Sequence, residues 1–357
     1  MKRIGVDVGG TFTDFIYVDD EGDIEVYKTS TTPHDPSIGM MEGINAICDK
    51  LGIAHDEIQE IFHGTTIATN MVLEHKGARA GMITTKGYRD IIHIARHKRP
   101  TNFSIVEDIP WQTHPVVRRH DRYGVSERVV APDGAELIPL DEDEVRAAVR
   151  KMKEEKVEAI AVCFLFSFLN PAHEQRVKEI IEEEYPEVYI SLSSEVLPQF
   201  REYERFTTTG LNAYIGPTTS RYIRQLGQTL KEQGYTAKVH LMQSFGGVAS
   251  AEAAQEKPVN LLLSGPVGGV LGAIWTSKLT GIDNVITLDI GGTSADISVL
   301  SGLKPVMKHL LDTKVGGYSA MVPMVDVGTI GAGGGSIAYI DEGGFFRVGP
   351  QSAAAAP

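Results

Sequence analysis

The sequence predicts an α/β protein of two domains, and three observations support this prediction. The chain has 357 residues, and single hydrophobic cores rarely grow beyond about 250–300 residues, so two domains are expected. Segments with strand and helix periodicity alternate, which is typical of a parallel or mixed sheet. A strand–glycine turn–strand pattern occurs twice, once near each end of the chain. We place the domain boundary near residue 195, which gives domains of residues 1–195 and 196–357.

The elements of the first domain follow from apolar periodicity and helix-start signals. Apolar residues recur at helical spacing after Pro36, which predicts an amphipathic helix. Asp141 followed by Glu144 is typical of a helix start. The succession of strand, helix and strand that follows implies a parallel or mixed sheet. In order, we expect a strand at 4–8, a helix at 36–51, a helix after Asp141, a strand at 157–166, a helix at 172–185 and a strand at 188–192.

The second domain repeats this alternation. Short apolar runs predict strands, and a longer run that opens with Ser264-Gly265-Pro266 predicts a helix. The glycines at the start of this helix are explained either by anion binding at a helix N-terminus or by close packing on the sheet. Both interpretations stay open. The expected elements are strands at 239–242, 259–263 and 285–288 and a helix at 266–279.

Composition and charge exclude several classes of protein. The chain is 42% hydrophobic and 23% charged, and its net charge is −13, which argues against a disordered chain and against nucleic-acid binding. The two cysteines, Cys48 and Cys163, form no CxxC pair, so neither a disulfide framework nor a cysteine metal cluster is expected. The longest uncharged apolar run, 159–169, is too short to span a bilayer. Because no signal-peptide pattern precedes the first strand, we expect a cytoplasmic protein without membrane contact.

An internal repeat carries the predicted chemistry. Residues 4–18 read IGVDVGGTFTDFIYV and residues 286–300 read ITLDIGGTSADISVL. A glycine pair permits a tight turn and leaves backbone N–H groups bare, and the threonine adds a hydroxyl donor, so each loop can hold phosphate. A pair of ordinary hairpins is the alternative, and two copies in one register argue against it. The predicted phosphate-binding residues are Gly9, Gly10, Thr11, Gly291, Gly292 and Thr293.

Two aspartates and a third glycine loop complete the predicted nucleotide site. Asp7 and Asp289 each end the first strand of a repeat, where carboxylates from two domains can hold Mg²⁺ against a nucleotide. The loop GAGGGS at 331–336 has serine where a dinucleotide-binding fingerprint needs its last glycine, which argues against a Rossmann domain. We expect Gly333, Gly334 and Gly335 to contact adenosine instead.

The loops resemble the two phosphate motifs and the adenosine motif of the actin, sugar kinase and heat-shock chaperone ATPase superfamily. Within it, the whole chain resembles the hydantoinase A/5-oxoprolinase family, acetone carboxylase beta-subunit-like relatives included. The segments that carry this resemblance are IGVDVGGTFTDF at 4–15, HGTTIATN at 63–70, TTKGYRD at 84–90, LSSEVLPQFREYERF at 192–206, NAYIGP at 212–217, LLSGPVGG at 262–269, LDIGGTSADI at 288–297 and TIGAGGGSIAYID at 329–341.

The resemblance implies a two-domain actin-like ATPase (ribonuclease H-like) fold with a nucleotide cleft between the domains. Family members are longer, so we expect this fold to be incomplete at the C-terminus. The implied function is that of an ATP-dependent hydantoinase or 5-oxoprolinase subunit, which phosphorylates a cyclic amide carbonyl to create a leaving group. A ketone carboxylase subunit of the acetone type is the alternative. An ATP-gated switch or chaperone-like module is an alternative of another class.

The resemblance also implies a partner and a catalytic candidate. Relatives commonly place part of the reaction on another subunit, so we expect a hydantoinase B-type partner as well as a small cyclic amide or ketone substrate. We expect Asp7 and Asp289 to be the catalytic metal ligands. His63, in the segment HGTT, is a candidate for positioning the substrate carbonyl, and a structural histidine beside a turn is the alternative.

Overall fold

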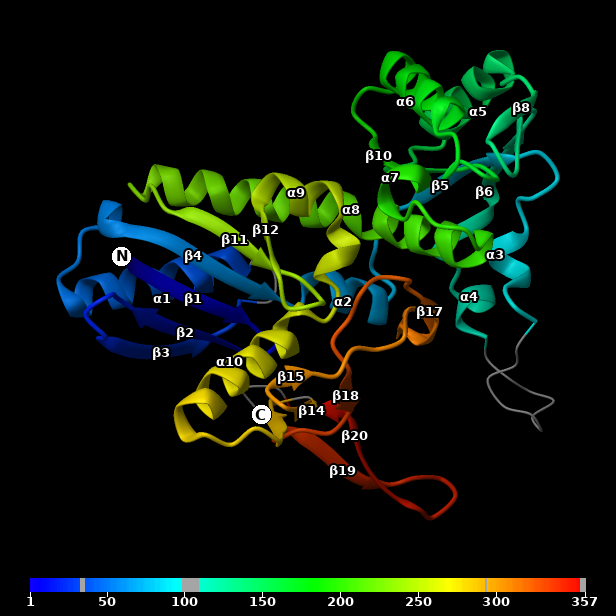
Figure 1. Ribbon diagram of the computed structural model, residues 1–357. Helices are drawn as coiled ribbons and strands as arrows, with labels where there is room; N and C mark the ends of the chain where they lie inside the picture. The colour runs from blue at the N-terminus through cyan, green and yellow to red at the C-terminus, as the bar shows by residue number, and fades with distance from the viewer. Residues whose placement is uncertain (33–35, 98–108, 293, 354–357) are drawn as a thin grey trace.

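The computed structural model describes residues 1–32, 36–97, 109–292 and 294–353 of a mixed α/β protein with several sheets. The largest sheet has six strands in the order β12-β11-β4-β1-β2-β3, and β1 pairs antiparallel with β2 and parallel with β4 (Figure 1). Its strands are β1 (Lys2–Val8), β2 (Phe12–Val18), β3 (Ile24–Ser30), β4 (Ile58–Thr65), β11 (Lys238–Met242) and β12 (Val248–Ser250).

Helix α1 (Pro36–Leu51) covers one face of this sheet and confirms the helix predicted at 36–51. Its apolar stripe includes Ile44 and Ile47, which are both fully buried. They pack in one hydrophobic core with the alternate side chains of β1 and β2 that point to the same face. The alternating apolar residues of the strands and the helically spaced apolar residues of α1 therefore pack in a single core.

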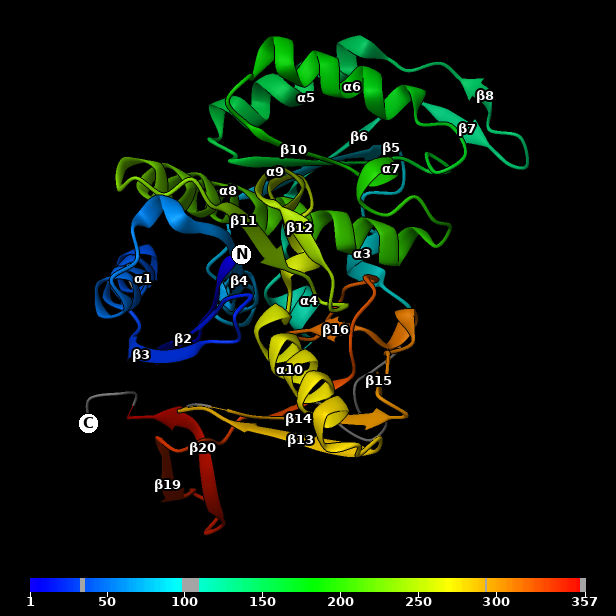
Figure 2. The same ribbon diagram turned by 60° about the vertical axis from the view of Figure 1, so that its left-hand side comes forward.

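A second sheet holds four parallel strands in the order β10-β9-β5-β6. Helices α5 and α6 lie side by side over one of its faces (Figure 2). The predicted helix start is confirmed, because the Asp141 side chain accepts the N–H of Glu144 at 3.0 Å. The elements are β5 (Ala80–Thr85), β6 (Val117–Val125), α5 (Glu142–Glu154), β9 (Ala159–Cys163), α6 (Ala172–Glu184) and β10 (Tyr189–Leu192).

Short elements lie between the strands and long helices of these two sheets or follow them in the chain. They are α2 (Ile67–Leu73), α3 (Ile91–Ile94), α4 (Pro110–Thr113), the paired strands β7 (Arg128–Val130) and β8 (Ala135–Ile138), α7 (Ser193–Val196) and α9 (Ala251–Glu256). The long helix α8 (Glu202–Glu232) runs across both sheets (Figure 1). One part of α8 packs on β9 and β10, and Leu226 and Leu230 pack in the core of the first sheet. This helix therefore holds the two sheets together.

A third sheet contains the second copy of the repeat. It joins β13 (Val285–Ile290), β14 (Ala295–Ser301), β15 (Lys304–Pro305) and β18 (Val327–Ile330), and helix α10 (Ser264–Thr280) packs on one face (Figure 2). Helix α10 confirms the helix predicted at 266–279. The remaining strands pair as hairpins: β16 (Lys314–Val315) with β17 (Tyr318–Ser319), and β19 (Ser336–Ile340) with β20 (Phe346–Ser352).

The strand predicted at 259–263 is wrong. Residues Pro258–Leu261 form a 3₁₀ helix, and Val259 and Leu261 are buried in the core beside α8. Proline cannot donate to a strand ladder and is tolerated in the first turn of a helix, so Pro258 favours the helical turn. A short apolar run cannot be assigned by periodicity alone.

The six-stranded sheet takes strands from both sides of residue 195, because β11 pairs with β4. The domain division at that residue stays a prediction. Among the described residues, no helix combines the length and the apolar character needed to cross a membrane.

Candidate active site

The two repeats form hairpins of the same geometry. In β1–β2 Asp7 pairs with Asp14, and in β13–β14 Asp289 pairs with Asp296. The turn is closed in the same way in both copies. The N–H of Gly9 donates to the carbonyl of Phe12 at 3.0 Å, and the N–H of Gly291 donates to that of Ser294 at 2.9 Å. The repeat in the sequence is therefore a repeat in backbone structure.

The fold brings the two glycine loops together. A Cβ atom built on Gly292 would lie 2.8 Å from the Oγ1 atom of Thr11 and 3.3 Å from its Cβ. Thr293 lies outside the described residues. Among the described residues, the N–H groups of Gly10 and Thr11 form no backbone hydrogen bond, so both can donate to a ligand.

Asp7 lies beside the two glycine loops with a raised pKa. Its Oδ1 atom is buried and has no hydrogen-bond partner among the described residues. Burial, and then the charges of Asp14 and Asp289, raise its pKa from 3.8 to about 6. A buried carboxylate without donors is costly unless a proton or a cation neutralises it. The position of Asp7 therefore fits a metal ligand.

Two glycines make room for this carboxylate. A Cβ on Gly64, near the end of β4, or on Gly265, in the first turn of α10, would lie 3.2 Å from Asp7 Oδ1. The two segments are tied together, since the hydroxyl of Ser264 donates to the carbonyl of Thr65 at 3.1 Å. Of the two explanations for the glycines of α10, close packing accounts for Gly265.

Asp14 and Asp296 are held by the third strand of each repeat. Each accepts a hydrogen bond from a side chain of that strand. Lys28 Nζ lies 2.6 Å from one oxygen of Asp14, and Thr329 Oγ1 donates to Asp296 at 2.5 Å. Burial raises the pKa of Asp296. Asp289 is exposed.

The third glycine loop packs directly on the glycine turn of the second repeat. The N–H of Gly334 donates to the carbonyl of Gly291 at 2.9 Å, and that of Gly335 donates to Gly292 at 2.8 Å. A Cβ on Gly333 would lie 2.5 Å from the Gly291 carbonyl oxygen. The loop lies at the predicted site, and two of its N–H groups are already used within the protein.

His63 lies in the interior of the first sheet. The residue is fully buried on β4, and its Nε2 atom lies 2.8 Å from the hydroxyl of Tyr222 on α8. Burial lowers the pKa of the imidazole from 6.5 to about 4, so it is neutral at pH 7. Its contact with Tyr222 links β4 to α8.

Pockets lie on both sides of α10 beside the two hairpins. One, of about 400 Å³, includes Asp7 and Asp14 in its lining, and one of about 360 Å³ includes Asp289 and Asp296. Gly269 of α10 lines both. A pocket of about 450 Å³ at His75 and His114 contains none of the predicted site residues.

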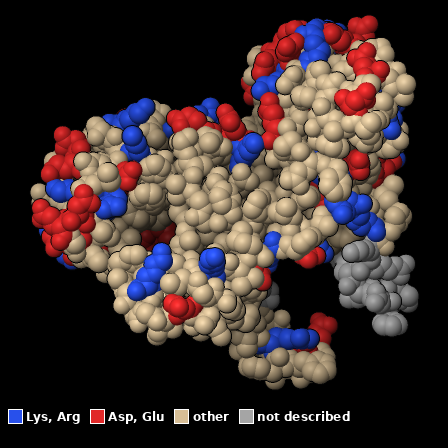
Figure 3. Space-filling model, in the orientation of Figure 1, with Lys and Arg blue, Asp and Glu red and all other residues tan. Residues whose placement is uncertain are grey.

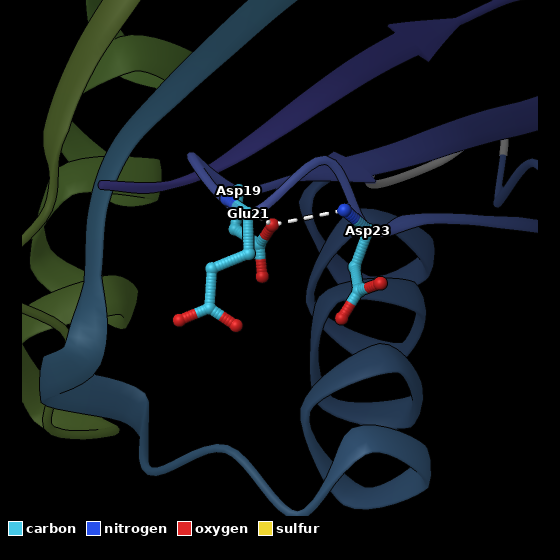
Figure 4. Close-up of side chains that lie close together, drawn as sticks. All are labelled: Asp19, Glu21 and Asp23. Carbon is cyan, nitrogen blue, oxygen red and sulfur yellow. Dashed lines mark hydrogen bonds between the residues drawn. The ribbon is translucent and has the colours of Figure 1, made fainter.

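Other charged features lie away from the two loops. Asp19, Glu21 and Asp23 gather in the turn between β2 and β3, at the opposite end of β2 from Thr11 (Figure 4). Asp19 Oδ1 accepts the N–H groups of Glu21 and Asp23, each at 3.0 Å, so the turn itself accounts for this aspartate. Acidic side chains also gather over α5 and α6 (Figure 3).

Sequence reasoning missed three groups around the site: Gly64, Lys28 and Tyr222. A signal existed for Lys28, because a third strand following the first hairpin brings a residue opposite Asp14. Gly64 beside Asp7 and Tyr222 beside His63 are contacts between segments that are distant in sequence, so no local sequence pattern predicts them.

Comparisons with known proteins place the chain in a family. Residues 3–185 match the hydantoinase/oxoprolinase N-terminal region, and residues 205–357 match the hydantoinase/oxoprolinase family. The chain is 38% identical to caprolactamase subunit alpha of Pseudomonas jessenii, over 99% of this chain and 51% of that protein. The chain spans about half the length of the curated relatives it matches.

Two solved structures share the fold. The crystal structure of ATP-dependent caprolactamase from Pseudomonas jessenii matches with a TM-score of 0.85 and 37% identity, over 99% of this chain and 51% of that one. The nucleotide-free structure of acetone carboxylase matches with a TM-score of 0.86 and 29% identity, over 99% and 52%. With family matches across both halves of its sequence, the chain belongs to the hydantoinase/oxoprolinase family.

Proposed function

We propose that this chain is the ATP-binding part of an ATP-dependent amidohydrolase of the hydantoinase/5-oxoprolinase type, on an actin-like ATPase fold with a nucleotide cleft. The observation that carries this proposal is the meeting of the two Asp-x-Gly-Gly-Thr loops, where Gly292 lies against Thr11. Two facing loops can grip a triphosphate from both sides, as phosphoryl transfer requires positioning more than covalent help.

In this proposal, phosphate is held by Gly9, Gly10, Thr11, Gly291, Gly292 and Thr293. The N–H groups of Gly10 and Thr11, which form no backbone hydrogen bond among the described residues, suit phosphate oxygens. The loop of Gly333, Gly334 and Gly335 contacts adenosine through backbone atoms other than the N–H groups of Gly334 and Gly335, which are bonded to the second loop.

Asp7 and Asp289 are the proposed ligands of Mg²⁺. The unpartnered, buried Oδ1 atom of Asp7 fits a hard cation, which prefers carboxylate oxygens. When bound, Mg²⁺ would neutralise charge on the phosphate oxygens. His63 is neutral and bonded to Tyr222, so its proposed role is to hold β4, and with it Gly64, in place beside Asp7.

The proposed chemistry begins with a phosphoryl transfer, which forms one bond and breaks one bond. The carbonyl oxygen of a cyclic amide attacks the γ-phosphorus of ATP, the bond to the β–γ bridging oxygen breaks, and ADP leaves. Water adds to the carbon of the resulting imidate phosphate, and the tetrahedral adduct collapses by breaking the ring C–N bond, so that the protonated amine leaves and an acyl phosphate remains. A second water hydrolyses the acyl phosphate to the open-chain carboxylate and phosphate. ATP therefore drives the opening of an otherwise unreactive ring.

Ketone carboxylation is the second candidate, and the match to an acetone carboxylase structure favours it. In that reaction phosphorylation of the ketone oxygen, with loss of an α-proton, gives an enol phosphate. Both reactions need the same nucleotide site, so the geometry of the loops serves either. The substrate pocket decides between them.

We also propose that the active protein includes a hydantoinase B-type partner subunit. Several relatives are named as subunits, among them caprolactamase subunit alpha. Among the described residues, neither cysteine lines the pockets beside the two hairpins, and both cysteines are buried. The chain alone is therefore expected to hydrolyse ATP slowly or not at all.

The test is a panel of reactions with MgATP and purified protein, with and without a B-type subunit. Hydantoin, 5-oxoproline, caprolactam and acetone plus bicarbonate are offered in turn, and phosphate release and product are measured. Substrate-dependent ATP turnover that needs the partner supports the proposal. Full turnover by the chain alone would refute the proposed need for a partner subunit. Absence of nucleotide binding would refute the proposed nucleotide site.

A further inference from the structure

The two repeats carry matching rows of polar side chains that differ at one position. In each repeat the two aspartates face each other across the hairpin. A third strand continues each row. Lys28 of β3 lies opposite Asp14 in the first repeat, and Thr329 of β18 lies opposite Asp296 in the second. Directly opposite residues on antiparallel strands share a face of the sheet, so the rows correspond residue by residue, with a cation in one and a neutral hydroxyl in the other.

The junction of the two glycine loops is short of positive charge. The two pockets beside the hairpins include the four aspartates of these rows in their linings, and among the described residues no Lys, Arg or His lines either pocket. A bound triphosphate would add further negative charge at this place, and Mg²⁺ would offset only part of it. A protein cation beside the phosphates would therefore lower the electrostatic cost of binding.

Lys28 supplies positive charge near this junction. Burial first, and then the charges of Asp14 and Asp289, raise the pKa of Asp7, and the charge of Lys28 opposes them. The Lys28 side chain is 53% exposed. Its ammonium group is therefore open to a ligand that enters from solvent.

The end of β3 is tied to the first glycine loop. The N–H of Thr31 donates to the carbonyl of Thr11 at 3.0 Å, and the hydroxyl of Thr31 donates to the carbonyl of Gly9 at 2.8 Å. Lys28 Nζ also lies 4.9 Å from the centre of the Phe12 ring, at the residue that follows Thr11. These contacts fix the position of β3, and with it the base of the Lys28 side chain, relative to the loop.

The ammonium group of Lys28 has a donor to spare. Its Nζ atom lies 2.6 Å and 2.8 Å from the two carboxylate oxygens of Asp14. An ammonium group has three N–H donors, and in the described part of the chain Lys28 Nζ has no further hydrogen-bond acceptor. Asp14 can therefore hold the ammonium in place while one N–H remains for a phosphate oxygen.

We propose that Lys28 is a further catalytic residue, which donates a hydrogen bond to the γ-phosphate of ATP while Asp14 positions it. This inference rests on the proposed function. The loop that we assign to adenosine is bonded to the turn of the second repeat, so the phosphates run from the second hairpin toward the first. The γ-phosphate then lies beside Lys28, whose charge stabilises the phosphoryl oxygens during transfer.

An exposed ion pair without a function is the alternative explanation of Lys28. The chain offers a matched control for it, because Lys50 Nζ lies 2.7 Å from a carboxylate oxygen of Glu25, at the other end of β3. The Lys50 side chain is 58% exposed. The two lysines thus share their strand, their kind of partner and their exposure, and only Lys28 lies beside the first loop.

The test compares the affinities of the chain for the magnesium complexes of a non-hydrolysable ATP analogue and of ADP, measured by calorimetry. Lys28→Met should lower the affinity for the ATP analogue by at least about tenfold, because a charge-assisted hydrogen bond to the γ-phosphate is lost. The affinity for ADP should fall by less than about twofold. Lys28→Arg keeps the charge and should recover most of the affinity for the ATP analogue. Lys50→Met should bind both nucleotides as the wild type does.

A second comparison separates the phosphate contact from the neutralisation of Asp14. Lys28→Met leaves the Asp14 carboxylate without its counter-charge, and this charge could itself repel the nucleotide. Lys28→Met combined with Asp14→Asn is therefore compared with Asp14→Asn alone, and the loss of affinity for the ATP analogue should persist. If the loss disappeared, Lys28 would act only through Asp14, and the proposal would be overturned.

The outcomes distinguish this proposal from the proposed function. If Lys28→Met bound the ATP analogue as tightly as the wild type, or lost affinity equally for both nucleotides, the role of Lys28 would be overturned and the nucleotide site would stand. If the wild-type chain bound neither nucleotide, the proposed function would fail and the role of Lys28 would fail with it.

Discussion

The first hairpin, β1–β2, lies inside the molecule, and the second, β13–β14, lies at its surface. The two hairpins share a sequence motif, a strand register and the hydrogen bond that closes the turn. Val6 is nevertheless 4% exposed, and its counterpart Leu288 is 61% exposed. Asp7 and Asp289 differ in the same way, since the Oδ1 atom of Asp7 is buried and Asp289 is exposed. Residues at corresponding positions of the two repeats are therefore buried to different extents, because α1, β4 and α10 surround the first hairpin.

The largest expected contrast is in stability. Val6→Asp should lower the free energy of unfolding by more than about 3 kcal/mol, because it buries a carboxylate without a partner. Leu288→Asp should change the free energy by less than about 0.5 kcal/mol, as for most surface substitutions. Urea unfolding of both variants gives the two values. Equal losses would mean that the second hairpin is as well covered as the first.

The two aspartates should behave alike in function. Asp7→Asn and Asp289→Asn should each lower ATP turnover by about 10²-fold or more, the cost of losing one group that stabilises charge in the transition state. Turnover is measured with the partner subunit present, and circular dichroism checks that both variants are folded. Full turnover in either variant would remove that residue from the site.

The same pair should differ in the pH dependence of stability. The pKa of Asp7 is raised from 3.8 to about 6 on folding, so the folded protein binds this proton more tightly than the unfolded chain does. Ionising Asp7 therefore costs stability, and the cost grows as pH rises from about 4 to 6 and persists above. Without metal, Asp7→Asn should raise the free energy of unfolding at pH 7 by up to about 3 kcal/mol, and by little at pH 4.

Asp289→Asn is the comparison variant for this measurement, because Asp289 is exposed and its charge contributes to the raised pKa of Asp7. Its gain in the free energy of unfolding at pH 7 should therefore be smaller than that of Asp7→Asn. If the difference in the free energy of unfolding between Asp7→Asn and wild type stayed constant from pH 4 to pH 8, the raised pKa of Asp7 would be contradicted.

The smallest effect concerns two glycines of α10. Gly268 has open space around its Cα, so Gly268→Ala should stabilise the protein by up to about 1 kcal/mol through helix propensity. A Cβ on Gly265 would press on Asp7 Oδ1 at 3.2 Å. Gly265→Ala should therefore give no such gain and should weaken Mn²⁺ binding, measured by calorimetry. Identical behaviour of the two variants would contradict the packing of α10 on Asp7.

The sequence predicted the elements whose information is local. The period of apolar residues predicted α1, and Asp141 with Glu144 predicted the start of α5. The run at 259–263 was misread because four apolar residues fit a strand or a buried helical turn equally well. The burial of Asp7 could not be predicted, because it depends on Gly64 and Gly265, which only the tertiary fold brings together.

The central claim is that the two glycine loops form one nucleotide site. Thr11→Cys combined with Gly292→Cys tests it, since the two Cβ positions lie 3.3 Å apart, close to the spacing of a disulfide. Cys48 and Cys163 are buried and should not interfere. We predict that mild oxidation joins the loops and lowers the affinity for a magnesium complex of a non-hydrolysable ATP analogue by at least about tenfold relative to the reduced form, because the phosphates must enter between the loops. A disulfide that fails to form, or one that forms and leaves the affinity unchanged, would contradict the claim.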